Sequence, residues 1–466
     1  MNVFTRFLRL LEPAAYMPVS QDTVLVAKRY RYWRLRIFIT MYVGYIFFYF
    51  TRKSFNYVMP MLAEDLSFTK GDLGMLSSIL YITYGISKFI SGIASDRSNP
   101  RFFMGFGLIA SGIINIIFGF ASSLWAFAIL WALNGWVQAW GWPSCTKQLT
   151  HWYSSDERGK WWSVCTSAHT VGGGLIPLVV AACITYYGSW RFGMYIPGIL
   201  GILIGLFIIR RMRDEPRSLG LPEIEEYRNG KSGNSADKVD DTKLTVREIL
   251  FTQVLSNKYV WILSLSYFFI YIVRTAVTDW GLVFLVEEKH YSLIDAGISI
   301  SWFEVGGFLG TIVAGWGSDF LFNGRRVPYS VLCSLGVLVS VLGLWHLSGR
   351  SVLVDASFMG LIGFFIFGPQ MLIGLAAAEF VDKKAAGAAN GFAGWFGYVG
   401  AAMAGYPLGL IIDKYGWYGM FVVLAICSVI ILLILLPMWS LNHHMELEPI
   451  EENMEELLES DHPEID

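Results

Sequence analysis

Charged residues are scarce in this sequence. Only 15% of the 466 residues are Asp, Glu, Lys or Arg, against roughly 25% in an average soluble domain. Hydrophobic residues make up 55% of the chain, which is more than a soluble core of this length can bury. This composition excludes a disordered chain, a disulfide scaffold and a nucleic-acid-binding protein. It indicates a protein that crosses a membrane several times.

Motifs for catalysis and metal binding are missing as well. The five cysteines stand singly in apolar stretches, without the CxxC pairs or Cys/His spacings of zinc sites. No G-x-x-x-x-G-K-[ST] loop is present, which argues against ATP as the source of energy. No nucleophile–base set or pair of carboxylates points to hydrolysis. We therefore expect neither an enzyme nor a protein that holds a metal ion or another cofactor.

Long apolar stretches predict an all-α membrane protein. A spanning helix needs about 20 apolar residues, and the chain offers about twelve such stretches. A polar segment at about 211–258 separates the sixth stretch from the seventh. We interpret this segment as a linker between two six-helix bundles, at 36–210 and 259–440. The stretches lie at about 36–60, 73–95, 102–121, 124–148, 163–186, 192–210, 259–286, 296–318, 329–347, 353–379, 388–411 and 418–440.

Basic residues predict the orientation of the bundles. Lys and Arg concentrate in the loops on one side, and loops of this kind face the cytoplasm. The N-terminal segment 1–35, the linker and the C-terminal segment 441–466 then all lie in the cytoplasm. Because nothing in the sequence marks an organelle, we expect a plasma membrane of the bacterial inner-membrane type. The basic residues on this side are Arg6, Arg9, Lys28, Arg29, Arg31, Arg34, Arg36, Arg97, Arg101, Arg158, Lys160, Arg210, Arg211, Arg213, Arg325, Arg326, Lys383 and Lys384.

The C-terminal tail is strongly acidic. It carries ten Asp and Glu residues from Glu446 to Asp466 and no Lys or Arg. A block of like charges at a chain end is usually solvated. A docking segment for a partner is the alternative interpretation.

The two predicted bundles repeat the same landmarks. Arg52 in the first stretch and Arg274 in the seventh are 222 residues apart, and three further pairs keep nearly the same offset. Four matches in register indicate a duplication, which is typical of transporters with a site between two halves near the membrane midplane. The other pairs are Gly92-x-x-x-Asp96 with Gly315-x-x-x-Asp319, Pro143 with Pro369, and Trp190 with Trp417.

Six short motifs resemble one protein family. The loop at 92–101 (GIASDRSNPR) resembles the signature of the major facilitator superfamily. Five other motifs resemble its organophosphate:phosphate antiporters, and among these the hexose-phosphate members, which include a glucose-6-phosphate receptor type that feeds a sensor kinase. The resemblance covers about 28–440. The five motifs are 49–55 (YFTRKSF), 84–89 (YGISKF), 168–174 (AHTVGGG), 271–274 (YIVR) with Asp279-Trp280, and 367–374 (FGPQMLIG).

Charged residues inside the spans are the first candidates for a substrate site, because a charge within a membrane is costly and usually functional. Arg52 and Arg274 occupy equivalent positions in the two repeats, so we expect them to face each other across a cavity. A guanidinium group matches phosphate oxygens bidentately, and the family resemblance implies that both arginines bind phosphate. The alternative is that they pair with Asp279 or Glu304 and hold the bundles together.

His169, Lys88 and Lys53 are further candidates. A histidine has an unperturbed pKa near neutral pH, and the resemblance implies that His169 bonds the phosphate; packing is the alternative. Lys88 either attracts the anion or forms a salt bridge that breaks during transport. Lys53 lies about 100° around the helix from Arg52, so we expect it to point elsewhere and to have a structural or gating role.

Several tyrosines lie one or two helical turns from these charges, on the same helix face. We expect their hydroxyl groups to line the cavity and to bond the phosphate or the sugar. Packing in the bundle and membership of an interfacial aromatic belt are the alternatives. The tyrosines are Tyr45, Tyr49, Tyr84 and Tyr271, with Tyr398 in the eleventh stretch as a further candidate.

Other charged residues are expected to form ion pairs or gates. Asp96 and Arg97 follow the second stretch, and Asp319 follows the eighth. The resemblance implies that such charges pair across helix ends and hold one conformation. Asp279 and Glu304, inside the spans, are candidates for the same role.

Together these residues predict a secondary transporter that exchanges a sugar phosphate for inorganic phosphate by alternating access, with glucose 6-phosphate as the first candidate. We expect a monomer embedded in the lipid bilayer. A membrane receptor for external glucose 6-phosphate that signals to a sensor kinase is one alternative, and a proton-coupled organophosphate symporter is another. The sugar stays open because Phe367 replaces a Tyr of glycerol-phosphate members, and because the eleventh stretch lacks the acid–base pair of some hexose-phosphate members.

Overall fold

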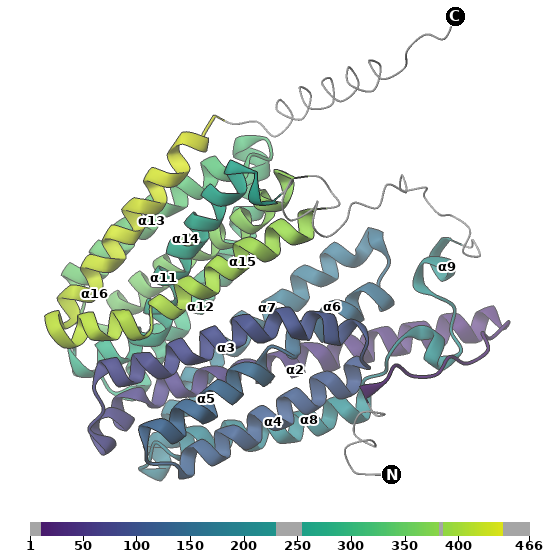
Figure 1. Ribbon diagram of the computed structural model, residues 1–466, viewed down its shortest axis with the longest axis horizontal. Helices are drawn as coiled ribbons and strands as arrows, with labels where there is room; N and C mark the ends of the chain where they lie inside the picture. The colour runs from purple at the N-terminus through teal and green to yellow at the C-terminus, as the bar shows by residue number, and fades with distance from the viewer. Residues whose placement is uncertain (1–10, 230–253, 382–384, 441–466) are drawn as a thin grey trace, which may run out of the picture.

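The computed structural model describes residues 11–229, 254–381 and 385–440. The first ten residues, part of the linker and the acidic tail 441–466 lie outside the described part of the chain. The described residues form two bundles of helices that lie side by side, one from each half of the sequence (Figure 1).

The N-terminal bundle also binds the start of the linker. Trp152 Nε1 donates to the carbonyl oxygen of Asp214 (2.7 Å), and the Asp214 carboxylate accepts from the backbone N–H of Ala14 (2.9 Å). The short helices η1 (Pro216–Leu219) and α9 (Ile224–Asn229) follow. The helices of the bundle are α2 (Thr23–Leu66), α3 (Lys70–Asp96), α4 (Pro100–Phe120), α5 (Leu124–Gln138), α6 (Gly141–Trp152), α7 (Ser155–Tyr187) and α8 (Phe192–Arg211).

The C-terminal bundle ends in a helix that contains a sharp kink. Gly416 in this helix has φ 65° and ψ −166°, in a region that residues with a side chain rarely adopt. The chain reverses its direction there and then closes with η3 (Leu436–Met438). The helices are α11 (Lys258–Glu287), α12 (Leu293–Phe322), α13 (Arg326–Leu347), α14 (Val352–Glu379), α15 (Ala386–Met403) and α16 (Tyr406–Leu435).

Within the described residues, nine helical segments are long and apolar enough to cross a membrane. One of them, Ala388–Met438, contains two crossings that meet at the Gly416 kink. Helix α2 supplies a further crossing, and α5 with α6 supplies another. The chain therefore crosses twelve times, six in each bundle.

Two of the predicted stretches differ in the structure. The first helix begins at Thr23 rather than near residue 36, and the Asp22 side chain caps it. Its 44 residues span about 66 Å at ~1.5 Å per residue, about twice the ~30 Å of a hydrocarbon core. The fourth stretch breaks after Gln138 because Pro143 lacks an N–H and its ring clashes with the carbonyl group four residues earlier.

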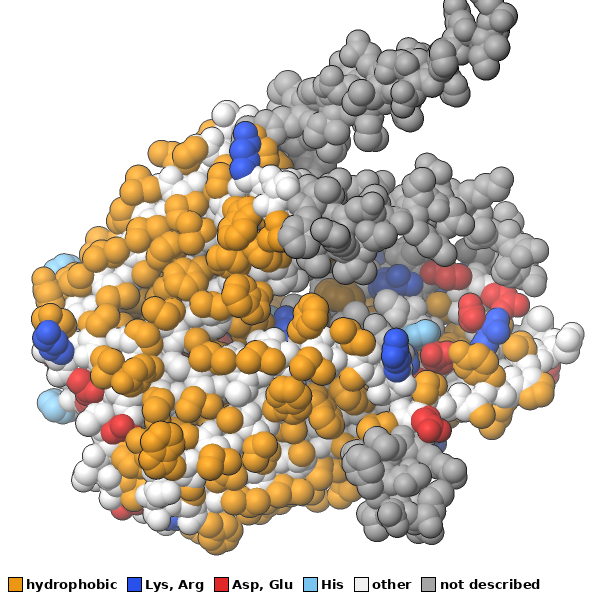
Figure 2. All heavy atoms as spheres, in the orientation of Figure 1, with side chains coloured by type: hydrophobic (Ala, Val, Ile, Leu, Met, Phe, Trp, Pro, Cys, Tyr) orange, Lys and Arg blue, Asp and Glu red, His pale blue; other side chains and the backbone are white. Residues whose placement is uncertain are grey.

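The helices of both bundles run between two ends of the molecule. We call the end with residues 211, 322 and 440 the terminal face, because both described chain ends lie towards it (Figure 1). The other end, with the turns at 67–69 and 188–191, is the opposite face. Hydrophobic side chains cover the sides of both bundles in the view of Figure 2, and charged side chains gather near the helix ends. This is the distribution expected for a surface that contacts lipid.

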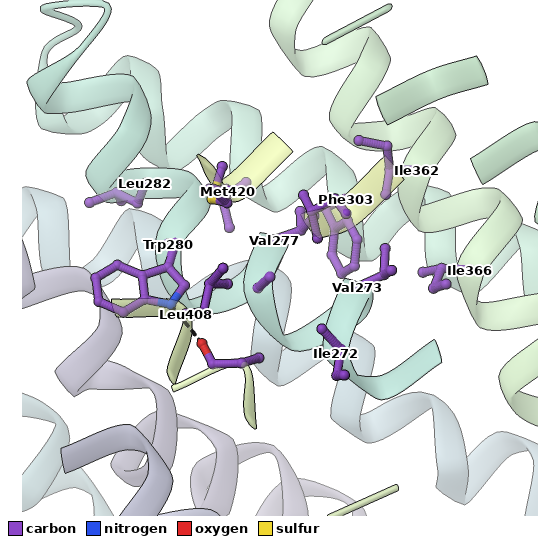
Figure 3. Close-up of a cluster of buried hydrophobic side chains, with 14 of the residues drawn as sticks. Ile272, Val273, Val277, Trp280, Leu282, Phe303, Ile362, Ile366, Leu408 and Met420 are labelled. Carbon is purple, nitrogen blue, oxygen red and sulfur yellow. Dashed lines mark hydrogen bonds between the residues drawn. The ribbon is translucent and has the colours of Figure 1, made fainter. Parts of the chain in front are cut away.

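The core of the C-terminal bundle lies around α11. Side chains of this helix meet Phe303 of α12 and Ile362 and Ile366 of α14 (Figure 3). Trp280 Nε1 donates to the carbonyl oxygen of Ala404 (2.8 Å). This bond fixes α11 against the break between α15 and α16.

Glycines let helices α12 and α14 touch through their backbones. A Cβ atom on Gly306 would lie 1.9 Å from the carbonyl oxygen of Gly360, and one on Gly310 would lie 2.0 Å from that of Phe364. Gly315, on the same helix, has only the end of Met371 within reach, at 3.7 Å. The contact therefore depends on the first two glycines and not on the third.

We expect Gly306→Ala to destabilise the protein by about 1–3 kcal/mol, because the added methyl group forces the two backbones apart. Gly315→Ala is the matched control, since both variants gain the same helix propensity. The thermal unfolding midpoint of each purified variant in detergent measures the effect. Equal midpoints would show that the close approach of α12 and α14 is not required.

Candidate substrate-binding cavity

A cavity of about 280 Å³ lies between the two bundles, about halfway along the helices. Helices α2, α3, α6 and α7 form one wall, and α11, α14 and α15 form the other. The volume is close to that of the smallest typical small-molecule sites, about 300 Å³. The structure brings together all nine residues predicted to bind substrate, which line this cavity: Tyr45, Tyr49, Arg52, Tyr84, Lys88, His169, Tyr271, Arg274 and Tyr398.

Arg52 lies on the N-terminal wall between aromatic rings. Its guanidinium carbon is 4.3 Å from the centroid of the Tyr84 ring and 4.9 Å from that of Tyr49. Nε donates to Gln138 Oε1 (3.2 Å), whereas Nη2 is buried without a hydrogen-bond partner. A buried donor without a partner costs about 1–3 kcal/mol, and more when it is charged. An anionic acceptor in the cavity would remove this cost.

Gln138 orients Arg52, a role that was not predicted from the sequence. The Gln138 amide nitrogen donates to Thr51 Oγ1 (2.8 Å) and Ser111 Oγ (2.7 Å), which leaves its oxygen to accept from Arg52. Ser111 in turn donates to Asn134 Oδ1 (2.5 Å). One signal was available, because Asn134 and Gln138 are amides four residues apart on one face of an apolar helix.

Arg274 lies on the C-terminal wall. Its guanidinium carbon is 4.5 Å from the centroid of the Phe367 ring, and Nε has no hydrogen-bond partner within the described residues. Asp279 pairs with Lys53 instead of an arginine, and one carboxylate oxygen of Glu304 is without a partner. The alternative interpretation, in which acidic residues neutralise both arginines, therefore does not describe this conformation.

His169 on α7 contacts residues of both bundles. Its ring stacks on Phe367 of α14 (centroids 5.9 Å apart, planes at 13°) and lies 5.8 Å from the ring of Tyr49. Nδ1 bonds the carbonyl oxygen of Thr166. Because a carbonyl oxygen only accepts, Nδ1 carries the hydrogen and Nε2 is the remaining nitrogen. Neutral His169 thus offers an acceptor, and protonated His169 offers a donor.

Lys88 reaches across to the other bundle. Its Nζ lies 3.5 Å from the hydroxyl oxygen of Tyr398 on α15 and 5.0 Å from the centroid of that ring. No described carboxylate lies within ion-pair distance of Lys88. In this conformation its charge is therefore available to an anion in the cavity.

Lys53 joins the two bundles at the floor of the cavity. Its Nζ lies 2.9 Å from Asp279 Oδ1 and 3.2 Å from Thr278 Oγ1, both on α11. Tyr81 donates to the same carboxylate (3.0 Å), and Asn56 Nδ2 also bonds it. We had expected Lys53 to point elsewhere, but it lines the cavity together with Arg52, because side chains on two faces of α2 reach the cavity.

The cavity carries excess positive charge. Arg52, Lys88 and Arg274 line it without an ion-pair partner, and no Asp or Glu is among its described lining residues. Glu304 lies outside this lining and packs against α7, where a Cβ atom on Gly173 would be 2.7 Å from its Oε1. The arrangement favours the binding of an anion with two or more oxygens.

The charged loops of the terminal face lie apart from the cavity. Asp319 near the end of α12 bonds Arg326 at the start of α13, so this charge pairs across two helix ends within one bundle. Arg97 is exposed and pairs with no described carboxylate. The side chain of Asp96 lies outside the described part of the structure. The role of these charges as a gate remains a prediction.

The two bundles close the cavity from the opposite face. Asp413 of α16 accepts from the backbone N–H groups of Lys70 (2.9 Å) and Gly71 (2.7 Å), which begin α3, and Lys70 Nζ bonds Glu287. A Cβ atom on Gly74 would lie 2.4 Å from the carbonyl oxygen of Gly405. These contacts bring α3 against α16 with little room between their backbones.

The cavity has fewer contacts on the side of the terminal face. Among described residues, Lys88 on α3 is the last residue of that helix to bond the other bundle. On α7 the last such hydrogen bond towards the terminal face is the one that Ser301 Oγ donates to the carbonyl oxygen of Gly174 (2.7 Å). A Cβ atom on Gly92, Gly391 or Gly394 would meet nothing within 4 Å. In this conformation the halves are thus joined on the opposite face and separated towards the terminal face.

Comparison with known proteins identifies the family of this chain. Residues 41–405 match the family model of the Major Facilitator Superfamily. The chain belongs to this superfamily. Membership confirms the predicted fold, an all-α membrane protein with twelve spanning helices in two bundles. It also confirms a multi-pass integral membrane protein that serves transport and is not an enzyme.

Two relatives are about half identical to this major facilitator protein. One is a probable hexose phosphate transport protein of Chlamydia trachomatis, 51% identical over 94% of this chain and 98% of the relative. Another is the membrane sensor protein UhpC of Escherichia coli, 50% identical over 92% of this chain and 98% of the relative. They confirm the organophosphate branch that the sequence motifs resemble.

The fold is also similar to solved structures. One is a bacterial homologue of the human lysosomal transporter Spinster, in an inward-facing and unoccupied conformation. It has a TM-score of 0.70 at 16% identity, over 89% of this chain and 98% of that one. At this identity the similarity supports the fold alone.

We expect Gln138→Leu to weaken phosphate binding roughly tenfold, because a hydrogen bond to a charged group contributes about 1.5–3 kcal/mol. Gln148→Leu is the matched control, since Gln148 is equally buried but bonds the carbonyl oxygen of Arg213 (2.7 Å). Calorimetric titration of each purified variant with inorganic phosphate measures the affinity. If both variants bind phosphate like the unmodified protein, Gln138 does not position Arg52.

Proposed function

We propose that this protein is a secondary transporter that exchanges a sugar phosphate for inorganic phosphate by alternating access. The observation that carries the proposal is the pair of arginines from equivalent repeat positions, Arg52 and Arg274. Both line one cavity, and both keep a buried nitrogen without a partner. The similarity to the hexose phosphate transport protein of Chlamydia trachomatis supports the substrate class.

The charge of the cavity explains why exchange is obligatory. A phosphate dianion that leaves water needs compensating positive charge, and Arg52, Arg274 and Lys88 supply it. Without an anion these charges face one another in an enclosed space, so an empty cavity resists closure. Inorganic phosphate presents the same head group as the sugar phosphate, and it therefore allows the carrier to return.

Tyrosines and an indole surround the phosphate position and suit a sugar. Tyr45, Tyr49 and Trp142 lie along the N-terminal wall, and Tyr271 and Tyr398 lie along the C-terminal wall. Aromatic faces pack on the apolar side of a sugar ring, and hydroxyl groups bond its edge. We therefore propose a hexose phosphate, with glucose 6-phosphate as the first substrate to test.

We further propose that the two bundles rock against each other around this site. The Lys53–Asp279 ion pair and the contact of Asp413 with the start of α3 hold the opposite face closed. Binding of the anion draws the halves together near the terminal face, and these contacts then separate. The bundles at 36–210 and 259–440 are the moving units, and the terminal face lies in the cytoplasm of a bacterial-type inner membrane.

A receptor is the second candidate function, because the membrane sensor protein UhpC is 50% identical to this chain. The same cavity would then bind external glucose 6-phosphate, and the output would be contact with a sensor kinase. A proton-coupled symporter is the third candidate, and it would depend on His169, since no described Asp or Glu lines the cavity.

Exchange in liposomes tests the function directly. The purified protein is reconstituted into vesicles loaded with phosphate, and uptake of labelled glucose 6-phosphate is measured with glycerol 3-phosphate and phosphate as competitors. We expect uptake that requires internal phosphate. Uptake driven by a pH gradient without internal phosphate would identify a symporter, and binding without flux would identify a receptor.

We expect Arg52→Lys and Arg274→Lys each to lower the exchange rate by about 100-fold or more. An ammonium group keeps the charge but cannot form the two parallel hydrogen bonds of a guanidinium. Arg350→Lys, an exposed change near the opposite face, serves as the control. Rates near those of the unmodified protein in a folded Lys variant would contradict the assignment of phosphate to these arginines.

A further inference from the structure

The extension of α2 beyond the bundle has two different faces. One face docks onto the protein: the Tyr30 ring stacks on Tyr227 (centroids 4.3 Å apart), and Arg34 bonds Glu157. The other face carries Lys28 and Arg31, which are exposed. The first face is explained by packing against the linker and the start of α7, whereas the second has no role in the transport cycle proposed above.

The second face borders a groove of about 640 Å³ between α2 and the end of α8. Four cationic side chains line it, and none of them forms an ion pair with a described residue. They are Lys28, Arg31, Arg36 and Arg211. The groove is thus a concentration of positive charge that the described chain does not neutralise.

Arg36 and Arg213 contribute to the positive charge of the groove and its surroundings. Arg36 lines the groove, where its Nε donates to the carbonyl oxygen of Arg211 (3.2 Å) and its Nη1 bonds the Tyr32 hydroxyl. The next cation along the chain is Arg213. Partial burial, together with the positive charge of Arg36, lowers the pKa of the Arg213 guanidinium. A surface with this potential attracts anions.

The same groove becomes apolar towards the membrane. Leu35 and Ile39 continue the exposed face of α2 by one and two turns, and their exposed fractions are 55% and 48%. On α8, the Arg211 guanidinium lies over the ring of Phe207, 5.3 Å from its centroid. Cations therefore lie at the level where the last turn of α8 ends, and apolar side chains lie directly below them.

We propose that this groove binds an anionic glycerophospholipid of the leaflet at the terminal face. Lys28, Arg31 and Arg211 contact the phosphate of the headgroup, and an acyl chain lies along Leu35 and Ile39. Basic pockets between spanning helices at a membrane surface bind lipid headgroups in this way. The α2 extension would then rest on the membrane surface through the headgroup.

The apolar floor decides between a lipid and a soluble anion. A free phosphate or sugar phosphate would use only the cations and would leave Leu35 and Ile39 exposed to water. A lipid satisfies both parts of the groove. Its charged headgroup and its hydrocarbon chain follow each other in the same order as the cations and the apolar side chains. The groove is also separate from the transport cavity, with which it shares no lining residue.

The test compares lipid binding to the full-length protein and to the variant Lys28→Gln/Arg31→Gln. The protein is purified in a mild detergent and titrated with phosphatidylglycerol or phosphatidylcholine, and native mass spectrometry counts the bound lipids. We expect preferential binding of phosphatidylglycerol. The double variant should lose it by roughly 25-fold, at about fivefold for each cation removed near an anionic headgroup.

The matched control is Arg350→Gln/Lys414→Gln, which removes two exposed cations near the opposite face and should bind phosphatidylglycerol like the unmodified protein. Phosphate binding in the transport cavity shows that each variant is folded. If the Lys28→Gln/Arg31→Gln variant binds phosphatidylglycerol as well as the control variant does, the proposal is overturned. Displacement of the lipid by inorganic phosphate at equal concentration would also overturn it, and would instead identify a site for soluble anions.

Discussion

Uncompensated positive charge in the membrane interior is the constraint on which the rest of this structure depends. A charge away from water is costly unless it has a partner. The cations of this chain fall into two groups in this respect. Lys53 is neutralised by Asp279 of the other bundle, whereas Arg52 and Arg274 keep nitrogens without partners. The first arrangement couples the bundles, and the second leaves donors that an anion in the cavity would satisfy.

The features that depend on repetition and hydropathy could be predicted from the sequence. Twelve apolar stretches give the twelve crossings, because a spanning helix must satisfy its own backbone in lipid. The shared offset of the repeats predicts that Arg52 and Arg274 line one cavity, since equivalent positions of two related bundles meet at the same depth. Helical phase then adds the tyrosines one or two turns away, such as Tyr49 and Tyr271.

Features that depend on contacts between distant segments could not be predicted. The spacing of Asn134 and Gln138 marks a polar helix face, but only the fold shows that this face meets Arg52. The partner of Lys53 is set by how closely the bundles approach at the floor of the cavity, and helical phase alone placed this lysine elsewhere. The early start of α2 also escaped prediction, because residues 23–35 are basic and are stabilised as a helix by the linker that packs on them, including Tyr227.

Asp413 bonds the N-terminus of α3, so the conformation that is closed at the opposite face depends on how this helix begins. The first N–H groups of any helix lack partners within that helix, and here the other bundle supplies them for Lys70 and Gly71. Under the rocking motion proposed above, these two amides pass to water when the opposite face opens. Their rates of hydrogen exchange would then report which face is open, without an added label.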